Sequence, residues 1–233
     1  MKIIMRFFII FVIILSNKMA FAQSSKTGNW LIYFGNQPLN NKWNVWNEVQ
    51  YRNYNFVGDL QQFLIRTGVG YNLSENNNNV LMGYAYVYSE NYFDKSDVKL
   101  SSEEHRIYQQ FLTRQNFTPF VIQHRYRIEE RFIPEDFHIR FRYALSIQVP
   151  LNHSTLIKNT LYLSANNEIF IKNTSPSFDR DRIYLGLGYV INPIFRVEVG
   201  MMSQILENTH RNQFQIALFN SMPIKFNTGK NID

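Results

Sequence analysis

The chain has 233 residues and no cysteine. Disulfides, thiolate metal sites and cysteine nucleophiles are therefore excluded. A lipoprotein anchored through a cysteine after a signal peptide is not expected either. An exported protein without disulfides needs another source of rigidity, and closing a sheet into a barrel supplies one because it leaves no free strand edge.

Long hydrophobic runs are also lacking. The longest, Phe7 to Leu15, is about half of the roughly 20 residues that a membrane-spanning helix needs. It follows a basic start with Lys2 and Arg6 and precedes the small-residue site Ala20 to Ala22. These three parts predict a secretory signal peptide over residues 1–22, cleaved after Ala22. Any membrane insertion of the mature chain would have to use strands.

The net charge is small once that peptide is removed. Cleavage removes Lys2, Arg6 and Lys18 and no acidic residue, which lowers the formal net charge from +6 to +3. So mild a basic excess does not support nucleic-acid binding.

The dominant pattern is alternation with a period of two, clearest between Gln123 and Val149. After a break at Pro134 to Asp136, one face carries His138, Arg140, Arg142, Ser146 and Gln148, and the other carries Ile139, Phe141, Tyr143, Leu145, Ile147 and Val149. A period of two is typical of β-strands, whose successive side chains point to opposite faces. This segment is therefore predicted to be a long β-hairpin with one charged and one aromatic face.

The same alternation recurs along the chain and predicts eleven strands, including a short first one at Gly28 to Phe34 and a long one at Thr155 to Ile171. Single-chain bacterial barrels have an even strand count, so we expect ten strands, without the first, or twelve, with one overlooked. The shortest turns, at 116–119, 151–154 and 192–193, join odd to even strands and should share one rim. We expect that rim to be periplasmic, with residues 94–102 and 172–179 outside.

Alternation does not say which face meets solvent. A soluble sandwich or lipocalin-like barrel would expose the arginines, whereas an outer-membrane barrel turns its apolar face to lipid. Long strands favour the membrane, as do aromatic residues near strand ends, which suit the membrane interfaces: Trp43, Tyr54, Tyr71, Tyr92, Phe132 and Tyr189. The prediction is an all-β, transmembrane, antiparallel up-and-down barrel of about ten to twelve strands, a single domain over residues 23–233. Its expected location is the bacterial outer membrane. It should be a monomer whose partners are lipid and the barrel-assembly machinery.

The polar face uses arginine rather than lysine, with glutamate partners, which is typical of enclosed ion pairs. We call these residues the charge ladder: Glu48, Arg52, Arg66, Glu104, Arg106, Arg125, Arg127, Glu129, Arg131, Arg140, Arg142, Glu168, Arg182 and Glu198. The ladder could be an anion-selective constriction in a narrow channel or transport-related barrel. Alternatively, it could plug the lumen of a structural or surface-binding barrel. A wide pore is not expected, because about eight strands leave a filled interior and open porins use about 16.

A lipid-modifying enzyme is a third hypothesis. The five histidines are scattered and none lies in a G-x-S-x-G motif. The best candidate, His138 beside Glu135 and Asp136, is more simply explained as a histidine at a loop edge. We therefore expect no enzyme and no catalytic residue.

Metal and cofactor sites are not predicted. The pairs Asp94 with Asp97 and Asp179 with Asp181 lack a calcium-binding loop and are interpreted as solvated loop charges. Gly186 and Gly188 stand among alternating strand residues with no helix after them, so they are expected to relieve crowding inside the barrel rather than bind a nucleotide.

Several short motifs resemble a known family. They are G-x-W at Gly28, W-x-E-x-Q-x-R at Trp46, R-x-R-x-E-x-R at Arg125, R-x-R at Arg140, N-E-x-F at Asn167, and the strand from Arg182 to Tyr189. The chain is similar to domain-of-unknown-function family 2490 (DUF2490), secreted proteins thought to form outer-membrane β-barrels. The resemblance covers nearly all of the mature chain. It implies a barrel and a location but has no activity to carry over.

Overall fold

The computed structural model describes residues 27–74, 77–93 and 96–224. The predicted signal peptide and its cleavage site lie outside these residues. The described part is all-β, as predicted. Its strands are β1 (Gly28–Pro38), β2 (Trp43–Asn53), β3 (Leu60–Asn72), β4 (Asn78–Tyr92), β5 (Lys99–Phe117), β6 (Phe120–Ile133), β7 (Asp136–Pro150), β8 (Leu161–Lys172), β9 (Phe178–Val190), β10 (Phe195–Ile205) and β11 (His210–Asn220). No helix long and apolar enough to cross a membrane occurs among these residues.

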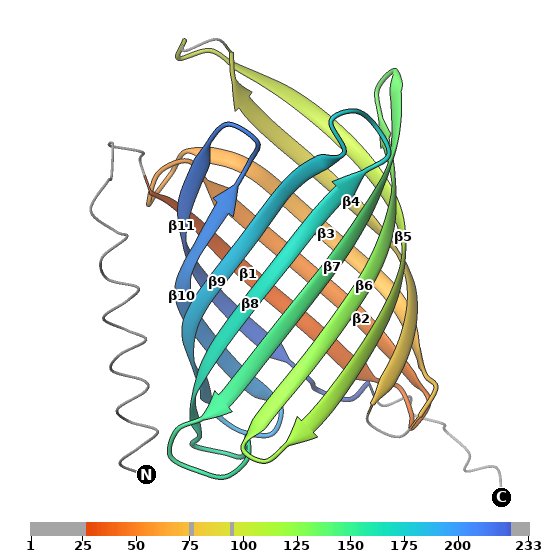
Figure 1. Cartoon of the computed structure of the whole chain (residues 1–233), viewed down its shortest axis with the longest axis vertical. Coiled ribbons are helices and arrows are strands. Elements are labelled where there is room, and N and C mark those ends of the chain that lie inside the picture. The colour runs from red at the N-terminus through yellow and green to blue at the C-terminus, as the bar shows by residue number, and fades with distance from the viewer. Residues whose placement is uncertain (1–26, 75–76, 94–95, 225–233) are drawn as a thin grey trace, which may run out of the picture.

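The strands form one closed barrel in which each pairs with its neighbour in sequence (Figure 1). The expectation of ten or twelve strands is wrong. Eleven strands close because β1 and β11 pair in parallel, with Trp30 opposite Gln215 and Phe34 opposite Phe219. An odd number of alternating strands makes the first and last run the same way, so the closing pair has to be parallel. The first segment therefore belongs to the barrel.

The odd count also places the ends of the strand set at opposite rims. The turns 39–42, 118–119, 151–160 and 191–194 share the rim at the bottom of Figure 1, where β3 and β11 end. We call it the β11-end rim. The connections 54–59, 134–135, 173–177 and 206–209 share the other, the β1-start rim, where β1 begins and β4 ends. The predicted grouping of the three short turns on one rim is therefore confirmed.

Several strand boundaries differ from the predicted ones, and two of the differences change a turn or a loop. The predicted strand from Thr155 starts only at Leu161, so this turn is not short. Asn159 adopts a left-handed conformation with φ of 66°, and Asn152 accepts a hydrogen bond from the Leu161 backbone N–H at 2.8 Å; together they close a loop where alternation alone suggests a strand. In contrast, β5 begins at Lys99 and so takes up part of the charged loop predicted at 94–102.

The two faces of the sheet follow the predicted alternation. On β7 the side chain of Arg140 points inward and is 4% exposed, whereas Phe141 points outward and is 47% exposed. The outward surface is apolar along most strands, with Leu31, Ile65, Met82, Ile128, Leu185, Leu187 and Val199 among its exposed members. A lumen packed with polar side chains and an outer surface packed with apolar ones is the reverse of a soluble barrel.

Aromatic side chains gather at both rims. Near the β11-end rim the rings of Trp43 and Tyr71 lie 4.9 Å apart in an edge-to-face arrangement. Near the β1-start rim the rings of Tyr54 and Tyr92 lie 5.0 Å apart. Side chains with an apolar ring and a polar tip suit the boundary between lipid and water.

Inside the barrel, one part of the wall is apolar rather than charged. Buried side chains from β1, β9, β10 and β11 form a lumen cluster, namely Trp30, Ile32, Tyr184, Met202 and Ala217, with Phe34 and Phe219 packed against it. Glycines make room for large inward rings. A Cβ at Gly188 would overlap the ring of Tyr162, and one at Gly186 would overlap the hydroxyl end of Tyr184. The predicted role of these two glycines agrees with this geometry.

Candidate functional site

The charge ladder lies inside the barrel, because each of its residues occupies an inward position of its strand. The structure joins eleven of the fourteen through ion pairs, namely Glu48, Arg66, Glu104, Arg106, Arg125, Arg127, Glu129, Arg131, Arg140, Arg142 and Glu168. They come from β2, β3, β5, β6, β7 and β8. The pairs thus connect strands that are not neighbours in the sheet as well as strands that are.

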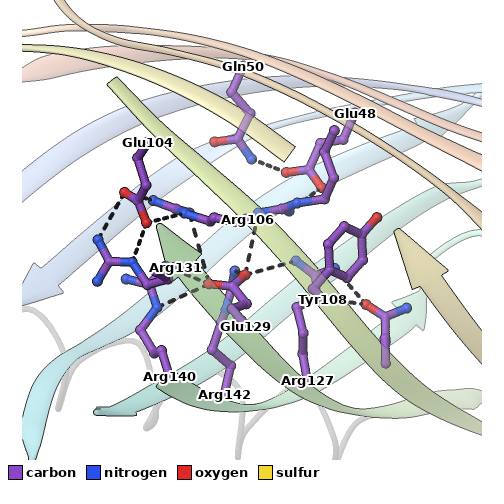
Figure 2. A network of polar contacts seen from close by, with 12 residues as sticks. Glu48, Gln50, Glu104, Arg106, Tyr108, Arg127, Glu129, Arg131, Arg140 and Arg142 are labelled. Atoms are coloured by element: carbon purple, nitrogen blue, oxygen red, sulfur yellow. Dashed lines mark hydrogen bonds and ion pairs between the residues drawn. The ribbon is translucent and has the colours of Figure 1, made fainter. Parts of the chain in front are cut away.

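Glu129 on β6 is the centre of this network (Figure 2) and its side chain is 0% exposed. Its carboxylate pairs with Arg142 at 2.5 Å and with Arg140 at 2.6 Å, both on β7. Longer contacts reach Arg66 and Arg127 at 3.6 Å and Arg106 at 3.9 Å. We call Glu129 with its five arginines the Glu129 hub. One carboxylate shared by guanidiniums from β3, β5, β6 and β7 ties together four strands.

Three further glutamates extend the hub in different directions. Glu48 pairs with Arg66 at 2.6 Å and accepts a hydrogen bond from Gln50. Glu104 accepts hydrogen bonds from Arg106 at 2.7 and 2.8 Å and also pairs with Arg131.

The third is Glu168 on β8, which pairs with Arg142 and Arg125, each at 2.7 Å. Buried charges need partners to offset the cost of leaving water. These ion pairs supply such partners for most of the charge ladder.

The other three ladder residues have no oppositely charged partner among the described residues. Arg52 donates to Gln50 and Gln62, and Arg182 donates to Gln204 at 3.0 Å. Glu198 instead accepts hydrogen bonds from the Tyr162 hydroxyl at 2.9 Å and from the Gln148 amide at 3.2 Å. The ladder is therefore one ion-pair network plus three charges held by neutral groups.

Two charged residues outside the predicted charge ladder, Asp179 and Arg180, belong to the ion-pair network. Asp179 pairs with Arg140 and with Arg180, each at 3.0 Å, and only 12% of its side chain is exposed. Interpreting Asp179 as a solvated loop charge is therefore wrong, because β9 starts at Phe178 and turns Asp179 inward. Strict alternation would have put Asp179 on the outward face with Asp181. The register between β8 and β9 shifts here, with Phe170 opposite Arg180 and Ile171 opposite Phe178, and this bulge places the Asp179 side chain inside with Arg140.

Inward aromatic rings also contact the arginines of the charge ladder. The guanidinium of Arg127 lies 4.7 Å from the ring centre of Tyr108, and that of Arg142 lies 4.5 Å from the ring of Phe170. Cation–π contacts of this kind stabilise guanidiniums in a poorly hydrated site. Strand alternation alone could not predict that these rings would meet arginines from other strands.

A cavity of about 890 Å³ runs along the lumen and is lined by residues from both rims. Gln61, Asn91 and Ser102 line it towards the β1-start rim, and Asn36 and Asn192 line it towards the β11-end rim. Its lining includes five glutamates, Glu48, Glu103, Glu104, Glu168 and Glu198, and eleven arginines, Arg52, Arg66, Arg106, Arg114, Arg125, Arg131, Arg140, Arg142, Arg180, Arg182 and Arg196. This surplus of guanidinium groups favours anions over cations inside the lumen.

The histidine considered for catalysis lies at the β1-start rim. His138 Nε2 is 2.8 Å from the Asp136 carboxylate, so the two residues do meet. No group of three or more histidine, aspartate or glutamate side chains in the described ranges could hold a metal ion. Asp181, the other member of the predicted loop pair, lies in β9 and not in a loop, and it accepts a hydrogen bond from Asn167 at 2.7 Å.

Comparison with known proteins agrees with the resemblance seen in the motifs. Neither a search of curated proteins nor a search of solved structures found a match. A family model described as a protein of unknown function, DUF2490, matches residues 27–215, a span that runs from the start of β1 into β11. The chain therefore belongs to the DUF2490 family of proteins of unknown function.

Proposed function

We propose that this protein is an outer-membrane β-barrel whose narrow lumen admits small anions past the Glu129 hub. The apolar outward face and the aromatic side chains at both rims support membrane insertion. Family membership is compatible with this location. The proposal assigns no catalytic residue and no cofactor to the chain, and it treats the barrel as a monomer delivered by the barrel-assembly machinery.

The observation that carries the proposal is the lumen cavity, which has lining residues at both rims and eleven arginines against five glutamates. In a site of low dielectric constant, uncompensated positive charge acts over a longer distance than in water. It therefore concentrates anions in the lumen and repels cations. Eleven strands enclose an interior between that of the filled eight-stranded barrels and that of the open porins of about 16 strands.

A second candidate is a plugged structural or surface-binding barrel, and the Glu129 hub itself favours it. Glu129, Arg127 and Tyr108 are each no more than 2% exposed, so water scarcely reaches them. If this layer never loosens, ions cannot pass from one rim to the other through the cavity. The two candidates differ in one measurable property, the passage of ions.

Conductance of the refolded mature chain in a planar lipid bilayer tests the proposal. The expected result is discrete steps with chloride preferred over potassium. Arg125→Gln should reduce that preference, because this arginine lines the cavity and 20% of its side chain is exposed. Lys158→Gln is the matched control, since Lys158 lies in an exposed loop at the rim. Folded protein that passes no current would instead support the plugged barrel.

The orientation in the membrane can be tested with introduced cysteines, because the chain has none of its own. We expect Asn208→Cys, in the 206–209 turn of the β1-start rim, to react with an impermeant maleimide on intact cells. Asn41→Cys, in the 39–42 turn of the β11-end rim, should react only after the outer membrane is opened. Labelling of Asn41→Cys alone on intact cells would reverse the orientation.

A further inference from the structure

Two of the ladder arginines without a carboxylate partner meet at one indole ring. The guanidinium carbon of Arg52, on β2, lies 3.8 Å from the ring centre of Trp30, on β1. That of Arg182, on β9, lies 4.9 Å from the same centre. The two guanidiniums therefore cannot be farther apart than these two distances together. We call Trp30, Arg52 and Arg182 the Trp30 site.

Neither arginine of this site forms an ion pair in the described part of the chain, and the side chains that accept their hydrogen bonds are neutral. Arg52 is held by the side-chain oxygens of Gln50, at 2.8 Å, and Gln62, at 2.6 Å. Arg182 is held by that of Gln204. Glutamine oxygens fix the direction of a guanidinium without neutralising it. The arginines of the Glu129 hub, by contrast, all face a carboxylate.

Burial makes this lack of a counter-ion costly. Trp30 is 4% exposed and Arg52 is 7% exposed. The indole Nε1–H of Trp30 is buried and has no hydrogen-bond partner in the described part of the chain. Buried charges and donors without partners cost free energy, and an anion bound between the two guanidiniums would offset that cost through charge-assisted hydrogen bonds.

Trp30 also belongs to the apolar lumen cluster with Ile32 and Met202. From Trp30, the inward positions of β1 continue through Ile32 to Phe34 towards the β11-end rim, and Phe34 stacks on Phe219 with ring centres 5.0 Å apart. These side chains line the same cavity as Arg52 and Arg182. The cavity thus has a cationic part and an apolar part that meet at Trp30.

We infer that the lumen binds an anionic amphiphile, with its carboxylate or phosphate group between Arg52 and Arg182 and its apolar chain along Ile32, Met202 and Phe34. An inorganic anion would satisfy only the cationic part, and a neutral apolar molecule would leave both guanidiniums without a counter-ion. This inference rests on the proposed lumen and names the class of molecule that the lumen takes.

Tryptophan fluorescence of the mature chain in lipid nanodiscs tests the inference directly. The chain has three tryptophans, so Trp43→Phe with Trp46→Phe leaves Trp30 as the only reporter. The probes are decanoate, decanol and inorganic phosphate. Decanoate should change the emission saturably, and decanol and phosphate should each need at least tenfold higher concentrations. Equal responses to decanoate and decanol would mean partitioning into lipid alone and would overturn the inference, and phosphate binding as well as decanoate would overturn its apolar part.

Variants of the site give a second, independent test. Arg52→Gln and Arg182→Gln should each weaken decanoate binding at least tenfold, and Arg52→Lys, which keeps the charge, should weaken it less than Arg52→Gln. The matched control is Arg114→Gln, because Arg114 also lines the cavity and bonds to a glutamine, Gln123, at 3.1 Å. Unchanged affinity in both site variants, or an equal loss in the control, would overturn the inference.

The binding assay needs no ion flow, so the two proposals can fail separately. A barrel that binds decanoate but passes no current contradicts the proposed function and leaves the Trp30 site standing. A barrel that conducts but does not distinguish decanoate from decanol contradicts the Trp30 site and leaves the proposed function standing.

Discussion

Replacing Glu129 by glutamine removes the common counter-charge of five arginines while keeping the size of the side chain. Its carboxylate makes two short ion pairs, with Arg142 at 2.5 Å and with Arg140 at 2.6 Å. Removing one partner of a buried ion pair leaves an uncompensated charge and costs about 3–5 kcal/mol.

Most of the arginines keep another partner, which holds the loss within that range. Arg142 still pairs with Glu168, Arg66 with Glu48, and Arg106 with Glu104. Arg127 keeps neutral partners, namely the side-chain oxygen of Gln110, at 2.6 and 3.0 Å, and the ring of Tyr108. We therefore expect Glu129→Gln to lower the free energy of unfolding by about 3–5 kcal/mol, with much of the loss due to Arg127.

Equilibrium urea unfolding of the protein in lipid vesicles, followed by tryptophan fluorescence, measures this loss. The matched control is Glu130→Gln, the same chemical change one residue along β6. Glu130 points outward and bonds only to Gln109 at a long 3.4 Å. Its replacement should change the free energy of unfolding by no more than about 0.5 kcal/mol.

A second substitution checks the physical reason. If the stranded guanidinium of Arg127 causes the loss, adding Arg127→Gln to Glu129→Gln should recover part of the stability, and the double-mutant cycle should show strong coupling. A loss in Glu129→Gln that does not exceed that in Glu130→Gln by at least about 1 kcal/mol would refute the reasoning, because a buried carboxylate shared by five arginines cannot be so dispensable.

Two other predictions concern the outer surface and the packing of the lumen. Leu185→Arg should lower the free energy of unfolding in lipid by about 2–4 kcal/mol, because Leu185 is 45% exposed on the outward face in the middle of β9. Leu151→Arg, in a rim loop and 52% exposed, should lower it far less, and equal losses would argue against a lipid-facing surface. Gly188→Ala should lower the free energy of unfolding by about 1–3 kcal/mol through overpacking, since its Cβ would overlap the ring of Tyr162. Gly35→Ala is the control, because the nearest atom to a new Cβ there is a side-chain hydroxyl at 3.0 Å. The same thermal unfolding midpoint for both alanine variants would contradict the crowding at Gly188.

The sequence by itself determined which face of each strand a residue occupies. Successive side chains of a strand point to opposite faces, so alternation along β7 is enough to put Arg140 and Arg142 on one side and Phe141 on the other. The same local rule identified the all-β class, the inward charge ladder and the grouping of the turns into two rims. It missed Asp179, because the register between β8 and β9 shifts at this residue and the alternation breaks there.

Only the tertiary structure decided how the strands close and which inward residues meet. Alternation carries no information about height in the barrel or position around it, because both depend on register and on long-range pairing. The parallel pairing of β1 with β11 therefore could not be read from either strand alone. Likewise, fourteen inward charges have similar local patterns. Register and closure nevertheless make Glu129 the hub and bring Arg52 and Arg182, which are distant in sequence, to the same Trp30 ring.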